Sequence, residues 1–167
     1  MPISDYLRRL RDKIGPDLLV VPSVTGVVFD DAGRLLMVLH ADRGIWVLPG
    51  GAIDPRETPA DALVREVWEE TGLRVRPVAL RGVFSGPEFL VRYRNGDEVV
   101  YVMSVFECAV LNGRPRPDGV ETLEVRYFGE AEVMALPTPP WARAILPSLF
   151  AGTGPGFRPP TWEPPGS

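Results

Sequence analysis

The chain has 167 residues, 45% of them hydrophobic, which suits a single domain with a real core. Its net charge of −4 and pI of about 5.1 argue against a binder of nucleic-acid duplexes, which normally presents a basic face. No run approaches membrane-spanning length, and the single cysteine, Cys108, excludes an internal disulfide, so we expect a cytoplasmic protein.

Residues 1–19 are predicted to form an amphipathic N-terminal helix that ends near Gly15. Its apolar side chains recur at helical spacing, with charged residues between them in place of an apolar signal segment. We expect this helix to pack on its own domain, with a second subunit as the alternative. The apolar positions are Ile3, Tyr6, Leu7, Leu10 and Ile14.

Residues 20–150 are predicted to form one domain. Strands are expected over 24–29 and 35–40, on either side of the turn signal Asp30–Gly33, and a short strand over 45–48.

The next element is a helix with clear signals at both ends. Thr58 is the expected N-cap, Pro59 suits the first helical position, and Gly72 is free to take the left-handed conformation that ends a helix. The side chains predicted to face the core are Ala60, Leu63, Val64, Val67 and Trp68.

Three glutamates of this helix share one side of it. Glu66, Glu69 and Glu70 stand at i, i+3 and i+4, so we expect an acidic face that points into a solvent-filled cleft. Like charges at this spacing repel by about 0.2–0.5 kcal/mol per exposed pair. A compensating divalent cation with oxygen ligands, Mg²⁺ or Mn²⁺, is therefore predicted.

Strands dominate the rest of the domain, and one pair flanks Asn95–Gly96, a strong hairpin turn signal. A last helix is predicted after Pro139–Pro140. The predicted strands are 74–84, 89–94, 98–110 and 125–128, and the last helix is 141–150.

Residues 151–167 are rich in glycine and proline and are predicted to form a loop or extended tail. Phe157 and Trp162 leave two alternatives open, a solvated tail or one that docks on the domain or on a partner.

The segment Gly51–Leu73 reads Gly51-x5-Glu57-x7-Arg65-Glu66-Val67-x-Glu69-Glu70-x-Gly72-Leu73. It resembles the signature box of the Nudix hydrolases, the MutT-like superfamily, without a break. The preceding Trp46-x-Leu48-Pro49-Gly50-Gly51 resembles the family's strand and loop before the box. The resemblance implies an α/β fold, an α/β/α sandwich with a mixed β-sheet.

The resemblance also implies an activity. Nudix hydrolases cleave a nucleoside diphosphate linked to another moiety, such as a nucleoside triphosphate or a nucleotide sugar like ADP-ribose, by attack of water at phosphorus. The alternative is a non-catalytic nucleotide-binding or sensor domain, and a diphosphate isomerase is disfavoured because Cys108 is not well placed. A small-molecule nucleotide is the expected partner, and a homodimer is possible.

Residue by residue, the resemblance makes Glu66, Glu69 and Glu70 metal-binding and catalytic, and Glu66 the first choice for the general base. The carbonyl of Gly50 matches a backbone metal ligand. Residues expected to support the site structurally are Gly51, Glu57, Arg65 and Gly72, with Glu57 and Arg65 as a charge pair that anchors the loop.

A further catalytic carboxylate is expected before the strand at 125–128. Glu121 is the favoured residue, Glu124 and Glu98 are alternatives, and a merely solvated acid is the competing interpretation.

Other residues have two interpretations each. His40 is either a structural histidine or a contact to substrate, and Pro87 is either an ordinary loop proline or the marker of ADP-ribose-cleaving relatives. Trp46 and Tyr93 are candidates to stack on a base, although core packing is the safer expectation for Trp46.

Overall fold

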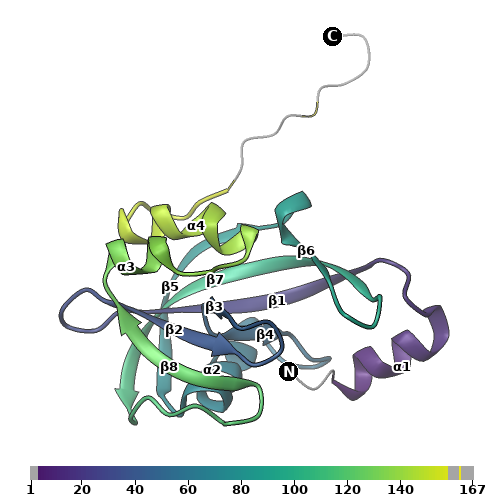
Figure 1. Ribbon diagram of the computed structural model, residues 1–167, viewed down its shortest axis with the longest axis horizontal. Helices are drawn as coiled ribbons and strands as arrows, with labels where there is room; N and C mark the ends of the chain where they lie inside the picture. Colours follow the sequence, from purple (N-terminus) through teal and green to yellow (C-terminus); the bar gives the residue numbers. More distant parts are fainter. Residues whose placement is uncertain (1–3, 158–161, 163–167) are drawn as a thin grey trace.

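The computed structural model describes residues 4–157 and residue 162, which fold into two β-sheets with helices on both sides (Figure 1). The strands are β1 (Leu19–Val28), β2 (Leu35–His40), β3 (Ile45–Val47), β4 (Gly50–Ala52), β5 (Arg74–Phe84), β6 (Leu90–Arg92), β7 (Glu98–Asn112) and β8 (Thr122–Phe128). The helices are α1 (Asp5–Ile14), α2 (Pro59–Thr71), α3 (Glu130–Ala135) and α4 (Pro140–Phe150), with a 3-10 helix η1 at Pro87–Phe89.

The strands divide between a larger and a smaller sheet. The larger has the order β4-β1-β7-β5, with β6 also paired to β7, and the smaller has the order β3-β2-β8. The long strands β1 and β7 are parallel, while the other pairs are antiparallel. Helix α2 lies on one side of the strands and α3 and α4 on the other (Figure 1). This arrangement confirms the predicted α/β/α sandwich, with its mixed strands split into two sheets instead of one.

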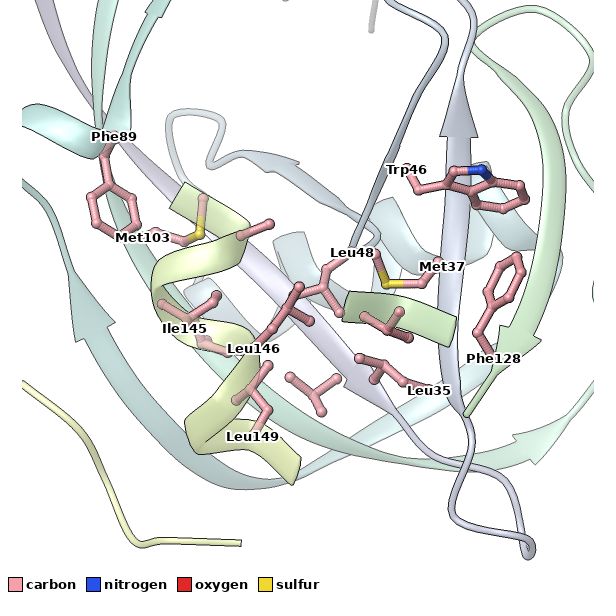
Figure 2. Packing of buried hydrophobic residues seen from close by; sticks show 14 residues of the cluster. Leu35, Met37, Trp46, Leu48, Phe89, Met103, Phe128, Ile145, Leu146 and Leu149 are labelled. Atoms are coloured by element: carbon pink, nitrogen blue, oxygen red, sulfur yellow. The ribbon is translucent and has the colours of Figure 1, made fainter. Parts of the chain in front are cut away.

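Successive side chains of β1 belong to two separate hydrophobic clusters, because neighbours along a strand point to opposite faces. Val24 and Val28 pack with α2, whereas Val27 packs with α4. The cluster on the α4 side, drawn in Figure 2, also contains Trp46, whose ring meets that of Phe128 edge-on with centroids 4.7 Å apart. Trp46 is therefore a core residue, as expected.

Most predicted elements are present, with shifted ends. The strands at 35–40 and 74–84 match β2 and β5, while β1 and β8 begin earlier than predicted and Phe89 belongs to η1. Two elements, β4 and α3, were not predicted from the sequence. Strand β4 is a Gly-Gly-Ala segment without alternating side chains, and α3 is a six-residue helix with no apolar repeat of its own.

The ends of α2 are as predicted. The Thr58 Oγ1 accepts the backbone N–H of Asp61 at 3.2 Å, and Gly72 has a φ of 69° at the C-terminal end. The faces of α2 are not as predicted, because Trp68 is 55% exposed and Ala60 is exposed, whereas Glu66 and Glu70 are buried.

The helical spacing explains this correction. Glu70 stands seven residues after Leu63 and three after Val67, so it shares their face and not the opposite one. That face meets β1 closely at Gly26, where a Cβ atom would lie 2.8 Å from the Val67 Cγ2. Only Glu69 of the three glutamates remains on the exposed side.

The two ends of the described chain attach differently. In α1 no side chain is fully buried, but Leu7 packs on the small cluster of Val21, Ala52 and Val99, so the helix contacts its own domain. Ile3 lies outside the described residues. Beyond α4, the Gly156 N–H donates to the Arg81 carbonyl at 2.9 Å.

The two aromatic residues beyond this point do not dock on the domain. Phe157 and Trp162 are each 76% exposed. Every helix within residues 4–157 and 162 is too short or too polar to span a membrane.

Candidate active site

The loop between β3 and β4 is tied directly to the acidic helix. The Gly50 N–H donates to the Glu70 Oε2 at 2.9 Å. Gly50 has a φ of 151°, and a Cβ atom there would lie 2.2 Å from the Val24 carbonyl oxygen, so only glycine fits. The backbone before the box is thereby held beside Glu70.

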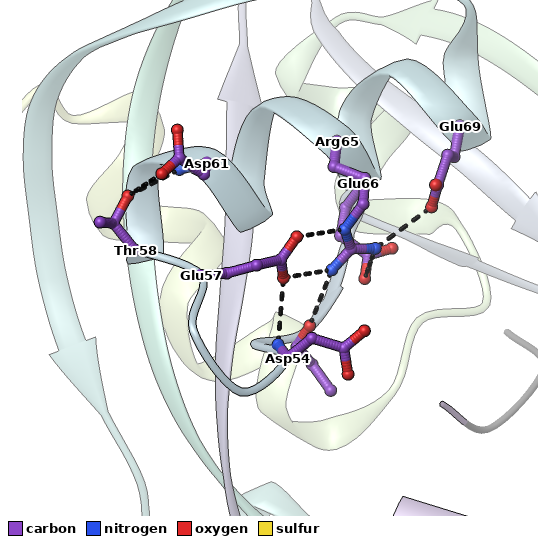
Figure 3. Close-up of polar contacts among 8 residues, drawn as sticks. Asp54, Glu57, Thr58, Asp61, Arg65, Glu66 and Glu69 are labelled. Atoms are coloured by element: carbon purple, nitrogen blue, oxygen red, sulfur yellow. Dashed lines mark hydrogen bonds and ion pairs between the residues drawn. The ribbon is translucent and has the colours of Figure 1, made fainter. Parts of the chain in front are cut away.

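Glu57 and Arg65 join the following loop to α2 (Figure 3). The Arg65 guanidinium donates to both Glu57 carboxylate oxygens, at 2.7 and 2.8 Å, and also to the Ala52 carbonyl at 3.3 Å. The Glu57 carboxylate in turn accepts the Asp54 N–H at 3.0 Å. These bonds lower the pKa of Glu57, chiefly through Arg65, so the pair stays ionised and fixes the loop.

The same guanidinium reaches two further carboxylates. Arg65 Nη1 lies 2.8 Å from the Glu66 Oε1 and 3.2 Å from the Glu69 Oε2, the contacts drawn in Figure 3. The Glu70 carboxylate instead accepts the hydrogen bond from the Gly50 N–H. Within residues 4–157 and 162, no three acidic, histidine or cysteine side chains are arranged so that they could hold one metal ion together.

Burial makes the two inward glutamates unusually weak acids. It raises the pKa of Glu66 to about 7, against the lowering effect of Arg65, and raises the pKa of Glu70 to about 8, against the hydrogen bond from Gly50. The charges of the neighbouring glutamates raise both pKa values further. The donors are all oxygens that gain from a positive neighbour, which fits a hard divalent cation.

Glu121 is the later acid that lies within electrostatic reach of the box. Its charge contributes to raising the pKa of Glu66 and of Glu70, and it partly opposes the lowering of the pKa of His40 by burial. Glu124 is exposed and lies 3.9 Å from Arg126, and Glu98 is paired with Arg92 at another part of the fold. Of the three candidates, Glu121 is therefore the one whose charge acts on Glu66 and Glu70.

A cleft extends from this acidic end. Gly50, Gly51 and Glu70 line one part of it, and Tyr93 lines another. His40 also lines the cleft, and burial lowers the pKa of its imidazole, which favours the neutral form. The exposed Pro87 is not among the lining residues.

Sequence reasoning missed several residues of the cleft. They come from the loop after β2, from β7, and from the N-cap and first turn of α4, which are far apart in the sequence and meet only in the fold. No local pattern distinguishes them from ordinary loop or strand residues. They are Asp42, Arg43, Tyr101, Met103, Pro139 and Trp141.

The sequence also matches a known family beyond the box. The model of the NUDIX domain family matches residues 20–149. The chain belongs to the Nudix family. It is a Nudix hydrolase, an enzyme that acts on a phosphoric anhydride.

Individual relatives agree with this assignment. A MutT-like protein of Streptomyces ambofaciens is 36% identical over 153 residues, which cover 92% of this chain and 91% of the relative. A putative 8-oxo-dGTP diphosphatase of Bacillus subtilis (strain 168) is 30% identical over 119 residues, 71% of this chain and 73% of the relative.

A solved structure shows the same fold. The MutT protein of Methanosarcina mazei Go1 superimposes with a TM-score of 0.66 at 21% identity, and the match covers 81% of this chain and 96% of that one.

The named relatives decide between the alternatives raised by the sequence. They include a putative diphosphatase and RNA pyrophosphohydrolases, so the enzyme interpretation holds over the non-catalytic one. Nudix hydrolases generally use divalent metal ions and act on nucleotide substrates. Cys108 is buried, and burial raises the pKa of its thiol to about 12, which leaves no thiolate for isomerase chemistry.

Proposed function

We propose that this Nudix hydrolase is a metal-dependent pyrophosphohydrolase that cleaves the diphosphate of a nucleoside diphosphate linked to another moiety. The observation that carries the proposal is the pair of buried carboxylates on α2, Glu66 and Glu70, of which Glu70 is bonded to Gly50 and lines the cleft. Buried charges of one sign are costly without a counter-charge, and a cation bound together with a diphosphate supplies one.

The residues proposed to hold Mg²⁺ or Mn²⁺ are Glu66, Glu69, Glu70 and the carbonyl of Gly50. When bound, the metal neutralises diphosphate charge and lowers the pKa of coordinated water. Arg65 then serves two purposes. It fixes the loop through Glu57, and it offsets the charge of Glu66 and Glu69 when no cation is present.

Glu66 is the proposed general base. Its carboxylate accepts a proton from the water whose oxygen forms the new bond to phosphorus, while the bond from that phosphorus to the bridging oxygen breaks. The proton then passes to solvent or to the departing phosphate. Glu121 is the alternative base, because it is the later acid whose charge acts on the same two glutamates.

The cleft gives some guidance on the substrate. Tyr93 and Trp141 are among its walls, and aromatic rings suit the flat face of a nucleobase. A nucleoside triphosphate is the substrate class we place first, in keeping with the relative named as a putative 8-oxo-dGTP diphosphatase. A nucleotide sugar such as ADP-ribose is second.

The test is a panel of nucleoside triphosphates, their oxidised forms and nucleotide sugars, each incubated with Mg²⁺, with Mn²⁺ or with a chelator. Only with metal do we expect a mononucleotide and diphosphate from a nucleoside triphosphate, or a mononucleotide and a sugar phosphate from a nucleotide sugar. Metal-independent turnover, or no turnover of any nucleotide, would contradict the proposal.

A further inference from the structure

The side chain of Arg11 makes polar contacts that join α1 to the rest of the domain. It lies outside the residues matched by the family model, yet only 10% of it is exposed. The guanidinium donates to the carbonyls of Gly15, at 3.1 Å, and of Asp17, which close the end of α1. It also crosses to β7, where it donates to the Glu98 carbonyl at 2.8 Å and lies 3.5 Å from the Asp97 carboxylate.

Asp97 belongs to the tight turn between β6 and β7. The Tyr93 N–H donates to the Asp97 carbonyl at 2.9 Å, and the Gly96 N–H donates to the Tyr93 carbonyl at 3.0 Å. Asn95 adds two bonds to Asp97, at 2.9 and 3.2 Å. Arg11 therefore contacts a turn whose first residue is Tyr93. Figure 1 shows α1 and this turn at the same end of the molecule.

Tyr93 connects the turn to the cleft. Its ring lines the cleft, and its hydroxyl lies 2.6 Å from the hydroxyl of Tyr101, another lining residue. The Arg43 guanidinium lies over the Tyr93 ring, 5.2 Å from the centroid. These three side chains form a wall that we call the tyrosine wall.

The tyrosine wall is also fixed from the opposite loop. Arg43 Nη2 donates to the Arg92 carbonyl at 3.3 Å, and Arg94 Nη2 donates to the Asp42 carbonyl at 2.7 Å. These two hydrogen bonds join the loop after β2 to the β6–β7 turn, and Arg11 contacts the same turn from α1. Two tyrosine rings, with a guanidinium stacked over one of them, offer flat surfaces that suit a heterocycle.

We infer that Arg11 is a positioning residue for base selectivity, acting through Tyr93 and the tyrosine wall. The inference rests on the proposed function only in taking the bound ligand to be a nucleotide. Arg11 is not among the residues that line the cleft, so its removal should loosen recognition of the base without altering the reaction at the diphosphate.

The experiment compares Arg11→Ala with Arg9→Ala, a matched loss of charge at an exposed position of the same helix. For the preferred nucleotide we expect Arg11→Ala to raise KM about tenfold, equivalent to about 1.4 kcal/mol of binding, with kcat nearly unchanged. The preference among bases should shrink by a similar factor. The inhibition constant of tripolyphosphate, which has no base, should stay constant, and Arg9→Ala should match the parent throughout.

A double-mutant cycle tests the route through Tyr93. If Arg11 acts through that ring, Tyr93→Ala and the double variant Arg11→Ala/Tyr93→Ala should have the same KM. Additive effects, a uniform loss over all nucleotides and tripolyphosphate, or a change in kcat alone would overturn the inference. If Arg11→Ala does not fold, Asp97→Ala takes its place in the experiment. It removes the partner of Arg11 on the turn, and we expect it to raise KM in the same way.

A failure of the proposed function can be distinguished from a failure of the proposed role of Arg11. The parent enzyme's turnover of the nucleotide panel tests the former, whereas binding of a non-hydrolysable nucleoside triphosphate analogue, followed by calorimetry, gives the Arg11 effect without any turnover. Equal affinity of parent and Arg11→Ala for the analogue would reject the positioning role.

Discussion

Helices α1 and α2 have similar ends and very different surroundings. Each begins at a capping hydroxyl, since the Ser4 Oγ accepts the Leu7 N–H at 3.3 Å and the Thr58 Oγ1 accepts the Asp61 N–H at 3.2 Å. Each ends at a glycine with positive φ, Gly15 or Gly72. Helix α2 nevertheless buries six residues, two of them glutamates, whereas α1 buries none.

The difference shows that caps fix where a helix begins and ends, while the surface it meets decides what it does. Helix α2 lies against β1 at Gly26, where the missing side chain lets Val67 approach. Because the helix lies so close to β1, Glu66 and Glu70 are buried together with Leu63. Helix α1 meets the domain through Leu7 and the Arg11 contacts, so it is placed to adjust the cleft rather than to build the catalytic end.

The largest expected effect comes from the acidic side chains of α2. We expect Glu69→Gln and Glu70→Gln each to lower kcat by about 10³-fold or more, because the proposed metal loses a charged ligand at the reacting phosphate. Both variants should fold, since the amide oxygen introduced by Glu70→Gln can still accept the Gly50 N–H. Formation of the mononucleotide with Mg²⁺ measures the effect.

The matched control on the other helix is Asp12→Asn, an exposed carboxylate of α1. It should leave kcat unchanged. Undiminished turnover in either α2 variant, or an equal loss in Asp12→Asn, would contradict the division of roles between the helices.

A second prediction compares how much each helix contributes to stability. Leu63→Ala leaves a cavity at a fully buried position of α2 and should lower the free energy of unfolding by about 2–5 kcal/mol. Leu10→Ala, on the partly exposed face of α1, should change it by less than about 1 kcal/mol. Urea unfolding followed by circular dichroism gives both values, and similar losses would mean that α1 is as much a part of the core as α2.

Local sequence patterns are enough for most of the fold. The caps Thr58 and Gly72, the Asn95–Gly96 turn and the strand at 74–84 depend on residues close in the chain, and each is present. The predicted faces of α2 are wrong because hydrophobicity alone assigns Trp68 to the core. Its position on the helix, about 140° from Leu63, places it in solvent.

The cleft is less predictable, for a different reason. The box residues are consecutive along one helix and one loop, so their grouping follows from spacing. Arg43, Tyr93 and Tyr101 come from three separate segments, and their meeting depends on the pairing of β6 with β7 and on the loop after β2. No window of sequence contains that information.

A final prediction concerns pH in the absence of divalent cations. Burial raises the pKa of Glu70 from the usual 4.5 to about 8, so the folded protein holds a proton that the unfolded chain releases near pH 4.5. The stability contributed by this group is therefore complete below pH 4.5 and is lost as the pH rises through about 8. Asp12 of α1, in contrast to Glu70, is exposed to solvent.

The useful window is about pH 7 to 8.5, around the raised pKa of Glu70. His40, whose pKa is lowered by burial, contributes stability that is present above its ordinary pKa of 6.5, so its effect is already constant there. With a chelator present, we expect the free energy of unfolding of the parent to fall by about 1 kcal/mol across the window. Glu70→Gln should remove most of that fall, leaving the smaller part that comes from Glu66, whose pKa is raised to about 7, and Asp12→Asn should retain the whole of it. Saturating Mg²⁺ should reverse the trend, because the cation binds the deprotonated carboxylates. Parallel curves for the parent and Glu70→Gln in chelator would mean that the buried charge of α2 has no part in the pH response.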